Sequence, residues 1–450
     1  MASYEDDENP DSLTGLDIAE ENVVEFKSNG LRLELAPFEL EHIYDYEPGG
    51  SHPVHLGDVL ADAYRIIHKL GHGGCATVWL ARDLRTCGAP KYVALKIIQS
   101  DASGDDCPEL LLYRLVEDGK SLPNICLPLV HFRFDGPNGS HLCFVYPVLG
   151  PWVSKGVFYA AENLEDILRG ICRQVTEAVA SLHAAGICHG DLRPHNILHP
   201  ITGLDGLPES EVLCILGEPR KNPVLDPAGQ ENTTRTAPRY LVYPVDWSSV
   251  NIDDFISKSA QLIDFGESFT TVGPPEDLGI PGPYRSLELI LDPRVFGIHS
   301  DLWALGCTLF EIRTGRKLIE SFEDEDDGYL DAMCQILGKF PEPWWSNWQG
   351  RVGIYKDEAD ENGRALLVKE HPPEERNFHQ SVAHDAKSIL DRLGPGVWYE
   401  LGGWFHAEIE GEERRLFADL LKRLVVYRPE DRMSAAEVLK HEWFVKYGKE

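Results

Sequence analysis

Several features that mark other protein classes are scarce or absent in this 450-residue sequence. Basic residues number 42 against 74 acidic residues, a formal net charge of −32, whereas nucleic-acid-binding proteins usually carry a basic surface. The ten cysteines include no Cys-x-x-Cys pair. We therefore expect reduced, mostly buried thiols rather than a disulfide framework or a zinc site. The longest apolar stretch, around residues 302–312, is too short to span a membrane.

The first residues, MASYEDDENPD, contain neither the basic region nor the apolar core of a secretory signal. Hydrophobic residues make up 43% of the chain and charged residues 26%, as in ordinary soluble globular proteins. We therefore expect a soluble monomer of the cytoplasm, the nucleus or both. It should contact neither membranes nor nucleic acid directly.

The N-terminal segment differs in composition from the rest of the chain. Its first 50 residues carry 14 acidic and 2 basic side chains, and segments of high net charge tend to stay disordered. The leucines of LRLELAPFEL, however, could order a short piece. Two interpretations are open for residues 1–61: an acidic flexible tail with a short lead-in, or an arm packed on the body.

A β-rich unit is predicted over residues 62–148, followed by a mainly helical unit over 149–446. Strands are expected at 63–74, 75–83, 91–99 and 141–149, where β-branched and aromatic residues alternate. A short helix should start near Pro108. The segment AENLEDILRGICRQVTEAVASLHAAG predicts one long amphipathic helix that ends at Gly186. Two stretches, 199–260 and about 340–412, interrupt this pattern as insertions, and most tryptophans should be core residues.

Two neighbouring motifs suggest contacts with phosphate. Residues 71–78, GHGGCATV, form a glycine-rich turn in which backbone N–H groups can approach phosphate oxygens; the alternative is a hairpin with no such role. Eighteen residues later, Lys96 lies in an otherwise apolar strand. A buried lysine needs a charged partner, and Glu109 on the following helix is the natural candidate.

Three oxygen-bearing side chains follow in two further motifs. HGDLRPHNIL, residues 189–198, contains Asp191 and Asn196, five residues apart in one loop, and LIDFGES contains Asp264 in a glycine turn. Such a set can supply a base or the oxygen ligands that magnesium prefers.

Together these motifs resemble the protein-kinase domain over about residues 62–444. YRSLE (284–288), DLWALG (301–306) and Arg432 add further matches. The likeness is greatest to the SR-protein kinases and their fungal relatives, in GGSHPVHLGD, KLGHGGCATVWLARD, CFVYPVLG and YRSLELIL. The resemblance implies an α+β, two-lobed fold with a small antiparallel β-rich N-lobe and a large, mainly α-helical C-lobe.

The same resemblance implies ATP and Mg²⁺ as cofactors and gives roles to individual residues. Lys96 should hold the α- and β-phosphates, positioned by Glu109. Asp191 should accept the proton of the substrate hydroxyl, and Asn196 and Asp264 should hold magnesium. The other nucleotide contacts implied are Leu70, Gly71, Gly73, Val78, Ala94, Pro147, Leu149 and Leu198. Glu288 and Arg432 should form a buried structural ion pair.

Four residues depart from the kinase pattern. Gly190 replaces the arginine that reads a phosphorylated activation loop; SR-protein kinases also lack it, so activity should not need that phosphorylation. Arg193 takes the place of the usual catalytic-loop lysine, and its forked guanidinium differs from an ammonium. Ala76 occupies the position of the third glycine in the glycine-rich loop. Pro281 stands where serine/threonine kinases usually carry a threonine that braces the catalytic aspartate.

We therefore predict an ATP-dependent serine/threonine protein kinase that acts on basic, Arg/Ser-rich protein substrates. Residues 320–331, ESFEDEDDGYLD, place seven carboxylates where arginines could be attracted, although such a run can also be a solvated loop. A pseudokinase or scaffold is the first alternative, because of Pro281 and Arg193. A small-molecule phosphotransferase of the aminoglycoside or choline type is the second; the long insertion before Asp264 argues against it.

Overall fold

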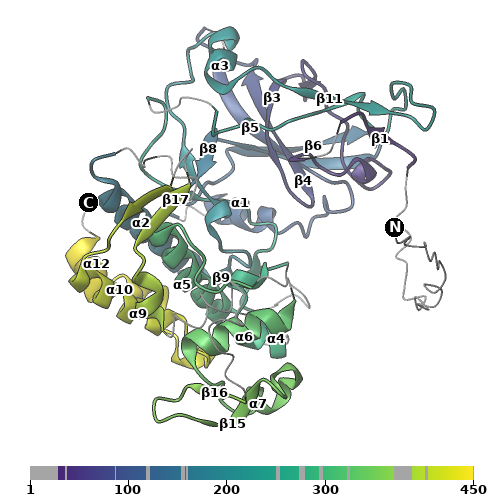
Figure 1. Ribbon diagram of the computed structural model, residues 1–450. Helices are drawn as coiled ribbons and strands as arrows, with labels where there is room; N and C mark the ends of the chain where they lie inside the picture. Colours follow the sequence, from purple (N-terminus) through teal and green to yellow (C-terminus); the bar gives the residue numbers. More distant parts are fainter. Residues whose placement is uncertain are drawn as a thin grey trace, which may run out of the picture.

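The fold is taken from a computed structural model that describes residues 29–448. The stretches left out of this description are 36–37, 87, 118–121, 154–157, 159–160, 250–253, 273–278, 293–296, 322–324, 369–387 and 401–403. Figure 1 shows a β-rich lobe above a larger, mainly helical lobe, which confirms the predicted two-lobed α+β fold.

The N-lobe is built on one six-stranded antiparallel sheet in the order β2-β3-β4-β5-β7-β6. Its strands are β2 (Val59–Leu60), β3 (Tyr64–His72), β4 (Ala76–Asp83), β5 (Lys91–Ile98), β6 (Val130–Gly136) and β7 (Gly139–Tyr146). Helix α1 (Glu109–Glu117) lies below the sheet, next to the C-lobe (Figure 1). The alternation of apolar residues places Leu80, Leu95 and Val145 in the interior, each at most 1% exposed.

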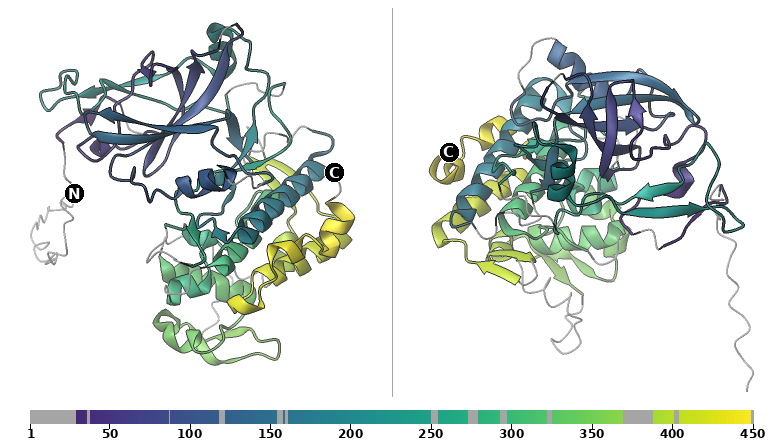
Figure 2. Two further views of the ribbon diagram at one scale, coloured as in Figure 1. Left: turned by 180° about the vertical axis from the view of Figure 1, so that it is seen from behind. Right: turned by 90° about the horizontal axis from the view of Figure 1, so that it is seen from above.

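The C-lobe is organised around two long helices that pack against each other, α2 (Leu164–Ala184) and α5 (Ile298–Thr314). The predicted end of α2 is confirmed: Gly186 follows it with a φ of +75°, a conformation that glycine adopts without strain. Figure 2 shows α10 and α12 alongside these helices. The other helices are α4 (Leu287–Leu291), α6 (Asp326–Leu337), α7 (Trp344–Asn347), α9 (Ile389–Leu393), α10 (Gly411–Leu424), α11 (Ala435–Val438) and α12 (Glu442–Tyr447).

Short strand pairs fix the loops between and below the lobes. The strands are β8 (Leu149–Trp152), β9 (Ile187–Cys188), β10 (Ile197–Pro200), β13 (Gln261–Leu262), β14 (Phe269–Thr270), β15 (Tyr355–Ala359), β16 (Ala365–Leu367), β17 (Val397–Glu400) and β18 (Trp404–Ala407). Strand β10 pairs with both β8 and β13, and β9 pairs with β14. These pairings hold the segments on either side of the long insertion close together.

The insertion at 199–260 is ordered over much of its length and packs on the N-lobe. It contains α3 (Glu209–Leu216), β11 (Lys221–Leu225) and β12 (Tyr240–Val242). Helix α3 contributes Val212 and Leu216 to a core shared with β3 and β4. Val242 enters the core of the main sheet, at 0% exposure. Figure 1 shows α3 and β11 beside the N-lobe sheet, far from the helices of the C-lobe.

Part of the acidic N-terminal segment is an arm packed on this insertion. Strand β1 (Arg32–Leu33) pairs with β11, so that Arg32 faces Leu225. Leu31, Leu40 and Ile43 of the arm are buried in a small core with Val224 and Leu241. The interpretation as an arm therefore describes residues 31–35 and 38–46, whereas residues 1–28 and 36–37 lie outside the described residues.

The arm is joined to β3 by a buried ion pair. The Nζ of Lys69, whose side chain is fully buried, bonds to the Glu41 carboxylate. The hydroxyl of Tyr46 donates to the same carboxylate at 2.8 Å. The Lys69 ammonium also lies 5.5 Å from the centre of the Trp79 ring. Since Lys69 is two residues before Gly71, the arm holds the strand that leads into the glycine loop.

The predictions for tryptophan and cysteine are confirmed where the structure describes them. Trp79, Trp303, Trp345, Trp348 and Trp443 are fully buried. The nine described cysteines are free thiols, and all but Cys75 and Cys214 are buried. Within the described ranges, no helix has the length and apolar character needed to cross a bilayer.

We expect Glu41→Gln to lower the free energy of unfolding by about 3 kcal/mol, because it leaves the Lys69 charge buried without a counter-charge. Urea denaturation measures this. Glu34→Gln, at an exposed position of the same arm, should change stability by less than about 0.5 kcal/mol. Combining Glu41→Gln with Lys69→Met removes both charges and should recover most of the loss. If the double variant is as unstable as Glu41→Gln, the buried charge is not the cause.

Candidate active site

Lys96 joins the glycine-loop strands to two carboxylates. The antiparallel pairing of β5 places it between Val78 of β4 and Phe144 of β7. Its Nζ bonds to Glu109 Oε1 on α1 and to Asp264 Oδ1 at 2.9 Å. Glu109, 2% exposed, also accepts a hydrogen bond of 3.0 Å from the Tyr146 hydroxyl. The sequence correctly identified Glu109 as the partner of Lys96 but did not single out Tyr146.

These contacts fix the charge states of the pair. Burial opposes the charge on Lys96, but the carboxylates of Asp264 and Glu109 prevail and raise the pKa of the ammonium. The positive charge of Lys96 in turn lowers the pKa of Asp264 to about 2. At neutral pH the site therefore holds an ammonium and an ionised Asp264, whose side chain remains 41% exposed.

Asp191 lies in a loop whose side chains point back at its carboxylate. Its Oδ2 accepts hydrogen bonds from Asn196 Nδ2 at 2.8 Å and from Arg193 Nε at 3.1 Å. Asn196 Nδ2 also donates to the main-chain oxygen of Asp191 at 2.8 Å. The second carboxylate oxygen, Oδ1, is buried and has no hydrogen-bond partner among the described residues. The two donors therefore fix the orientation of the carboxylate through Oδ2.

The pKa of Asp191 is raised from its ordinary value, chiefly because the carboxyl is buried. The positive charge of Arg193 and the hydrogen bond from Asn196 oppose this effect. A raised pKa makes the Asp191 carboxylate a stronger proton acceptor than an exposed aspartate.

Asp301, in the first turn of α5, fixes this loop in place. Its carboxylate accepts hydrogen bonds from the backbone N–H groups of His189, at 2.7 Å, and of Gly190, at 3.1 Å. His183 Nε2 lies 3.0 Å from the same carboxylate. The His189 ring reaches Ile263 O at 3.0 Å, and so connects the loop to the residue before Asp264. The sequence shows Asp301 only as part of the DLWALG motif and does not predict these contacts; the joint presence of DLWALG and HGD is the signal that could have indicated them.

Gly190 is required by its backbone conformation as well as by its lack of a side chain. Its φ is +83°, and a Cβ there would lie 2.2 Å from the main-chain oxygen of Glu267. The loop containing Asp191 and the turn containing Asp264 thus pack backbone against backbone at this point. Asp264 itself has a φ of +63°.

The residues predicted to contact the nucleotide come from both lobes. Gly71 and Val78 are paired across β3 and β4, and Ala94 is paired with Tyr146 at the end of β7. A Cβ added at Gly71 or Gly73 would have no other atom within 4 Å, so the backbone of the glycine loop is not covered by neighbouring segments at these positions. Leu198 lies in β10.

Three further residues predicted to contact the nucleotide lie elsewhere in the fold. Pro147 connects β7 to β8. Leu149 begins β8 and is paired with Pro200. The Leu70 side chain packs on the core that β3 and β4 share with α3.

The segment between Asp264 and α4 is held by direct contacts to the C-lobe. The Tyr284 hydroxyl donates to Glu311 at 2.6 Å, and Arg285 pairs with Asp326 at 2.7 Å. Glu288 and Arg432 form the expected buried ion pair, with distances of 2.5 and 2.7 Å. Residues 284–288 are therefore fixed to the C-lobe through their own side chains.

The structure also bears on Pro281 and on metal binding. Pro281 has no hydroxyl to offer, in keeping with the unpartnered Oδ1 of Asp191. No group of three or more His, Cys, Asp or Glu side chains in the described ranges could hold a metal ion. Asn196 and Asp264 could supply two oxygens, because Asn196 uses its amide nitrogen toward Asp191 and leaves its amide oxygen without a hydrogen bond to a described residue. The remaining ligands would have to come from a bound phosphate or water.

Comparisons with known proteins agree with this geometry. The protein kinase domain family matches residues 251–444, and the lipopolysaccharide kinase (Kdo/WaaP) family matches residues 148–210. The serine/threonine-protein kinase SRPK of Physarum polycephalum is 29% identical over 68% of this chain and 74% of its own length. The serine/threonine-protein kinase AFC3 of Arabidopsis thaliana is 29% identical over 89% of this chain and 86% of its own. Human SRSF protein kinase 3 is 34% identical over 36% of this chain and 29% of its own.

Replacing two glycines by alanine should have opposite effects. Gly190→Ala should lower the melting temperature, since the added Cβ meets Glu267 O and the positive φ disfavours alanine by about 1 kcal/mol before that clash. Gly170→Ala, in the middle of α2 with open space around the site, should stabilise by about 0.5–1 kcal/mol. Differential scanning calorimetry separates the two. Equal melting temperatures for Gly190→Ala and the parent would refute the close approach of the two loops.

Proposed function

Because this chain is an SR-protein-kinase-like serine/threonine protein kinase, we propose that it transfers the γ-phosphate of ATP, with Mg²⁺, to hydroxyls of Arg/Ser-rich proteins. The observation that carries the proposal is the connected set of side chains around the Asp191 carboxylate. This carboxylate lies in one loop with Arg193 and Asn196, and the His189 ring connects that loop to the residue before Asp264.

The chain's own residues would divide the reaction among them. Lys96 would exchange part of its contact with Asp264 for the α- and β-phosphates, while Glu109 keeps the ammonium in place. Asp264 and the amide oxygen of Asn196 would hold Mg²⁺, which neutralises charge on the phosphates when bound. Asp191 would take the proton from the substrate hydroxyl as that oxygen attacks the γ-phosphorus, and ADP leaves.

Arg193 fits a supporting position in this scheme. Its Nε donates to Asp191 Oδ2, which leaves the outer end of its guanidinium available to a phosphate oxygen. The substitution of arginine for the usual lysine therefore keeps a cation in contact with the base.

The two alternative functions are not favoured. A scaffold without phosphoryl transfer would not need a base, a lysine and two magnesium ligands in one connected set. A small-molecule phosphotransferase would not need the ordered segment at 284–288, which Glu311 and Arg432 fix to the C-lobe. The same contacts support activity without phosphorylation of that segment.

The acidic run at 320–331 contains both exposed carboxylates and carboxylates that bond to other side chains of the C-lobe. Asp326 pairs with Arg285, and Asp327 accepts a hydrogen bond of 2.7 Å from the Trp348 indole. Asp331 accepts one of 2.5 Å from the Tyr355 hydroxyl. Glu320 and Glu325 are exposed and have no such partner, and residues 323 and 324 lie outside the described residues. Glu320 and Glu325 thus support attraction of a basic substrate, whereas Asp327 and Asp331 anchor the aromatic side chains beneath.

Asp191→Asn should reduce phosphorylation of an Arg-Ser peptide by at least about 10³-fold, because the amide cannot accept the proton. Lys96→Met should do the same by loss of the phosphate contact. A radiolabelled ATP assay with Mg²⁺ measures turnover, and thermal unfolding reports whether each variant is folded. Nucleotide affinity should be kept in Asp191→Asn and reduced in Lys96→Met. Full turnover by Asp191→Asn would overturn the proposed role.

Removing four carboxylates near the start of α6 should raise KM for an Arg-Ser peptide several-fold and flatten its salt dependence. The effect follows from loss of attraction over a Debye length of about 8–10 Å. The variant changes Glu to Gln and Asp to Asn at Glu320, Glu323, Asp324 and Glu325. It spares Asp327 and Asp331, whose hydrogen bonds support the structure.

The matched control removes four exposed carboxylates elsewhere on the C-lobe. It carries Gln at Glu358, Glu361, Glu408 and Glu410. Its KM should stay within about twofold of the parent at physiological salt. If both variants raise KM equally, overall charge rather than this surface attracts the substrate.

A further inference from the structure

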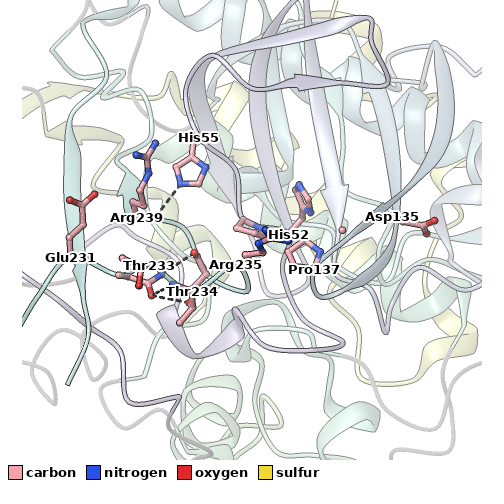
Figure 3. Close-up of a pocket in the computed structure, with 13 residues that line it drawn as sticks. His52, His55, Asp135, Pro137, Glu231, Thr233, Thr234, Arg235 and Arg239 are labelled. Carbon is pink, nitrogen blue, oxygen red and sulfur yellow. Dashed lines mark hydrogen bonds between the residues drawn. The ribbon is translucent and has the colours of Figure 1, made fainter. Parts of the chain in front are cut away.

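A cavity of about 860 Å³ lies in the N-lobe region, apart from the residues assigned to catalysis. Three segments distant in sequence form it: the lead-in at 52–55, the β6–β7 turn at 135–137, and the insertion loop at 231–239. We call it the lead-in pocket. Figure 3 shows the residues of all three segments that line it. The pocket exists only because the insertion folds back onto the N-lobe.

Two arginines give the pocket a positive centre in a chain of net charge −32. Arg235 and Arg239 both line it, are exposed, and form no ion pair with a described residue. The backbone N–H of Arg239 donates to His55 Nε2 at 3.1 Å, which fixes one wall. Unpaired guanidinium groups in a concave site are well suited to phosphate oxygens, which they bind in bidentate fashion.

Further polar groups surround these arginines. Thr233 and Thr234 line the pocket; the Thr234 backbone N–H donates to Asn232 Oδ1 at 3.0 Å, which sets the shape of their turn. His52 Nδ1 is buried against Gly136 and has no hydrogen-bond partner among the described residues. Burial lowers the pKa of His52 to about 4, so its ring adds no positive charge to the pocket at pH 7.

The wall behind His52 is held rigidly. Asn138, 3% exposed, donates from Nδ2 to Ser51 O at 2.6 Å and to Thr236 O at 2.7 Å. This one side chain therefore connects the lead-in, the β6–β7 turn and the insertion loop. Gly136 is needed for close packing, since a Cβ there would lie 2.3 Å from His52 Nδ1. The pocket is thus largely formed before any ligand arrives.

The acidic residues of the pocket are separated from its centre. Glu231 and Asp135 both line it and are exposed. Figure 3 shows them at opposite ends of the group, with Thr233, Thr234 and Arg235 between them. The order of charge across the pocket is therefore negative, positive, negative. A ligand of the opposite order, with cations on both sides of an anion, is complementary to it.

We propose that the lead-in pocket binds a phosphoserine flanked by arginines, the product of the proposed reaction on an Arg-Ser segment. Arg235 and Arg239 contact the phosphate, while Glu231 and Asp135 each face a flanking arginine. The inference rests on the proposed function for the source of this ligand. A phosphorylated stretch held here keeps neighbouring, still unmodified serines tethered near Asp191, which raises their effective concentration at the base.

The test is a binding experiment that involves no catalysis. It uses full-length Asp191→Asn protein without ATP and a synthetic fluorescent peptide, Arg-Ser-Arg-Ser-Arg, with or without phosphate on both serines. Combining Arg235→Gln with Arg239→Gln should weaken the phosphopeptide by about tenfold or more in fluorescence anisotropy, since charged hydrogen bonds are lost. Binding of the unphosphorylated peptide should change less than about twofold.

A matched control removes two cations from the same insertion outside the pocket. Arg220 and Lys221 lie over the rings of Tyr243 and Tyr240, at 4.7 and 4.4 Å. Arg220→Gln with Lys221→Gln changes the net charge by the same amount and should leave the phosphopeptide affinity within about twofold. If this control weakens binding as much as the pocket variant, the effect is general electrostatics and the proposal fails.

The flanking carboxylates provide an independent test. Glu231→Gln with Asp135→Asn should weaken the arginine-flanked phosphopeptide several-fold and leave an alanine-flanked phosphopeptide unchanged. Inorganic phosphate should compete for the pocket in the parent but not in the variant lacking both arginines. Unchanged phosphopeptide affinity in that variant overturns the proposal.

The two proposals can fail separately. Wild-type protein that binds the phosphopeptide through Arg235 and Arg239, yet transfers no phosphate to the unmodified peptide, would contradict the proposed function alone. Protein that phosphorylates the peptide but binds the product equally well without these arginines would contradict the pocket alone.

Discussion

The carboxylate of Asp301 is the contact on which the geometry of the site depends. It is buried, and it accepts the backbone N–H groups of two consecutive residues, His189 and Gly190. Burial alone would raise its pKa, but the hydrogen bond and charge of His183 prevail and lower it, so the group stays ionised. Because α5 is packed firmly against α2, the loop that carries Asp191 inherits the rigidity of the C-lobe core.

Local pattern and motif were enough to predict the parts of the molecule whose contacts are short-range or of a known type. Helix α2, strands β3 to β5 and the Glu288–Arg432 pair belong to this group. The pairing of Arg32 with Leu225 could not be predicted, because it joins segments almost 200 residues apart with little periodicity of their own. The positive φ of Gly190 could not be predicted either. A glycine in the sequence looks the same whether it is needed for its backbone conformation or because it removes a charged side chain.

The acidic run at 320–331 shows that the number of acidic residues in a sequence overstates the number of carboxylates that can attract a ligand. Seven carboxylates stand together in the sequence, but the structure gives three of them partners: Arg285, the Trp348 indole and the Tyr355 hydroxyl. Two of these partners are aromatic residues of the segment 340–412, which the sequence left as an insertion without a role. Residues 344–359 thus support α6, because Trp348 and Tyr355 hydrogen-bond to two of its carboxylates.

The path of the 199–260 insertion restricts how the two lobes can move. The chain leaves β10 at Pro200, packs α3 on β3 and β4, enters the core of the N-lobe sheet at Val242 and returns to β13. Near the base of this excursion, Ile201 pairs with Ile256. The chain therefore passes between the two lobes at three places, and the first of these is at Pro147. Any movement of one lobe against the other therefore has to displace two connections besides the one at Pro147, which favours sliding of the packed segments over bending at a single connection.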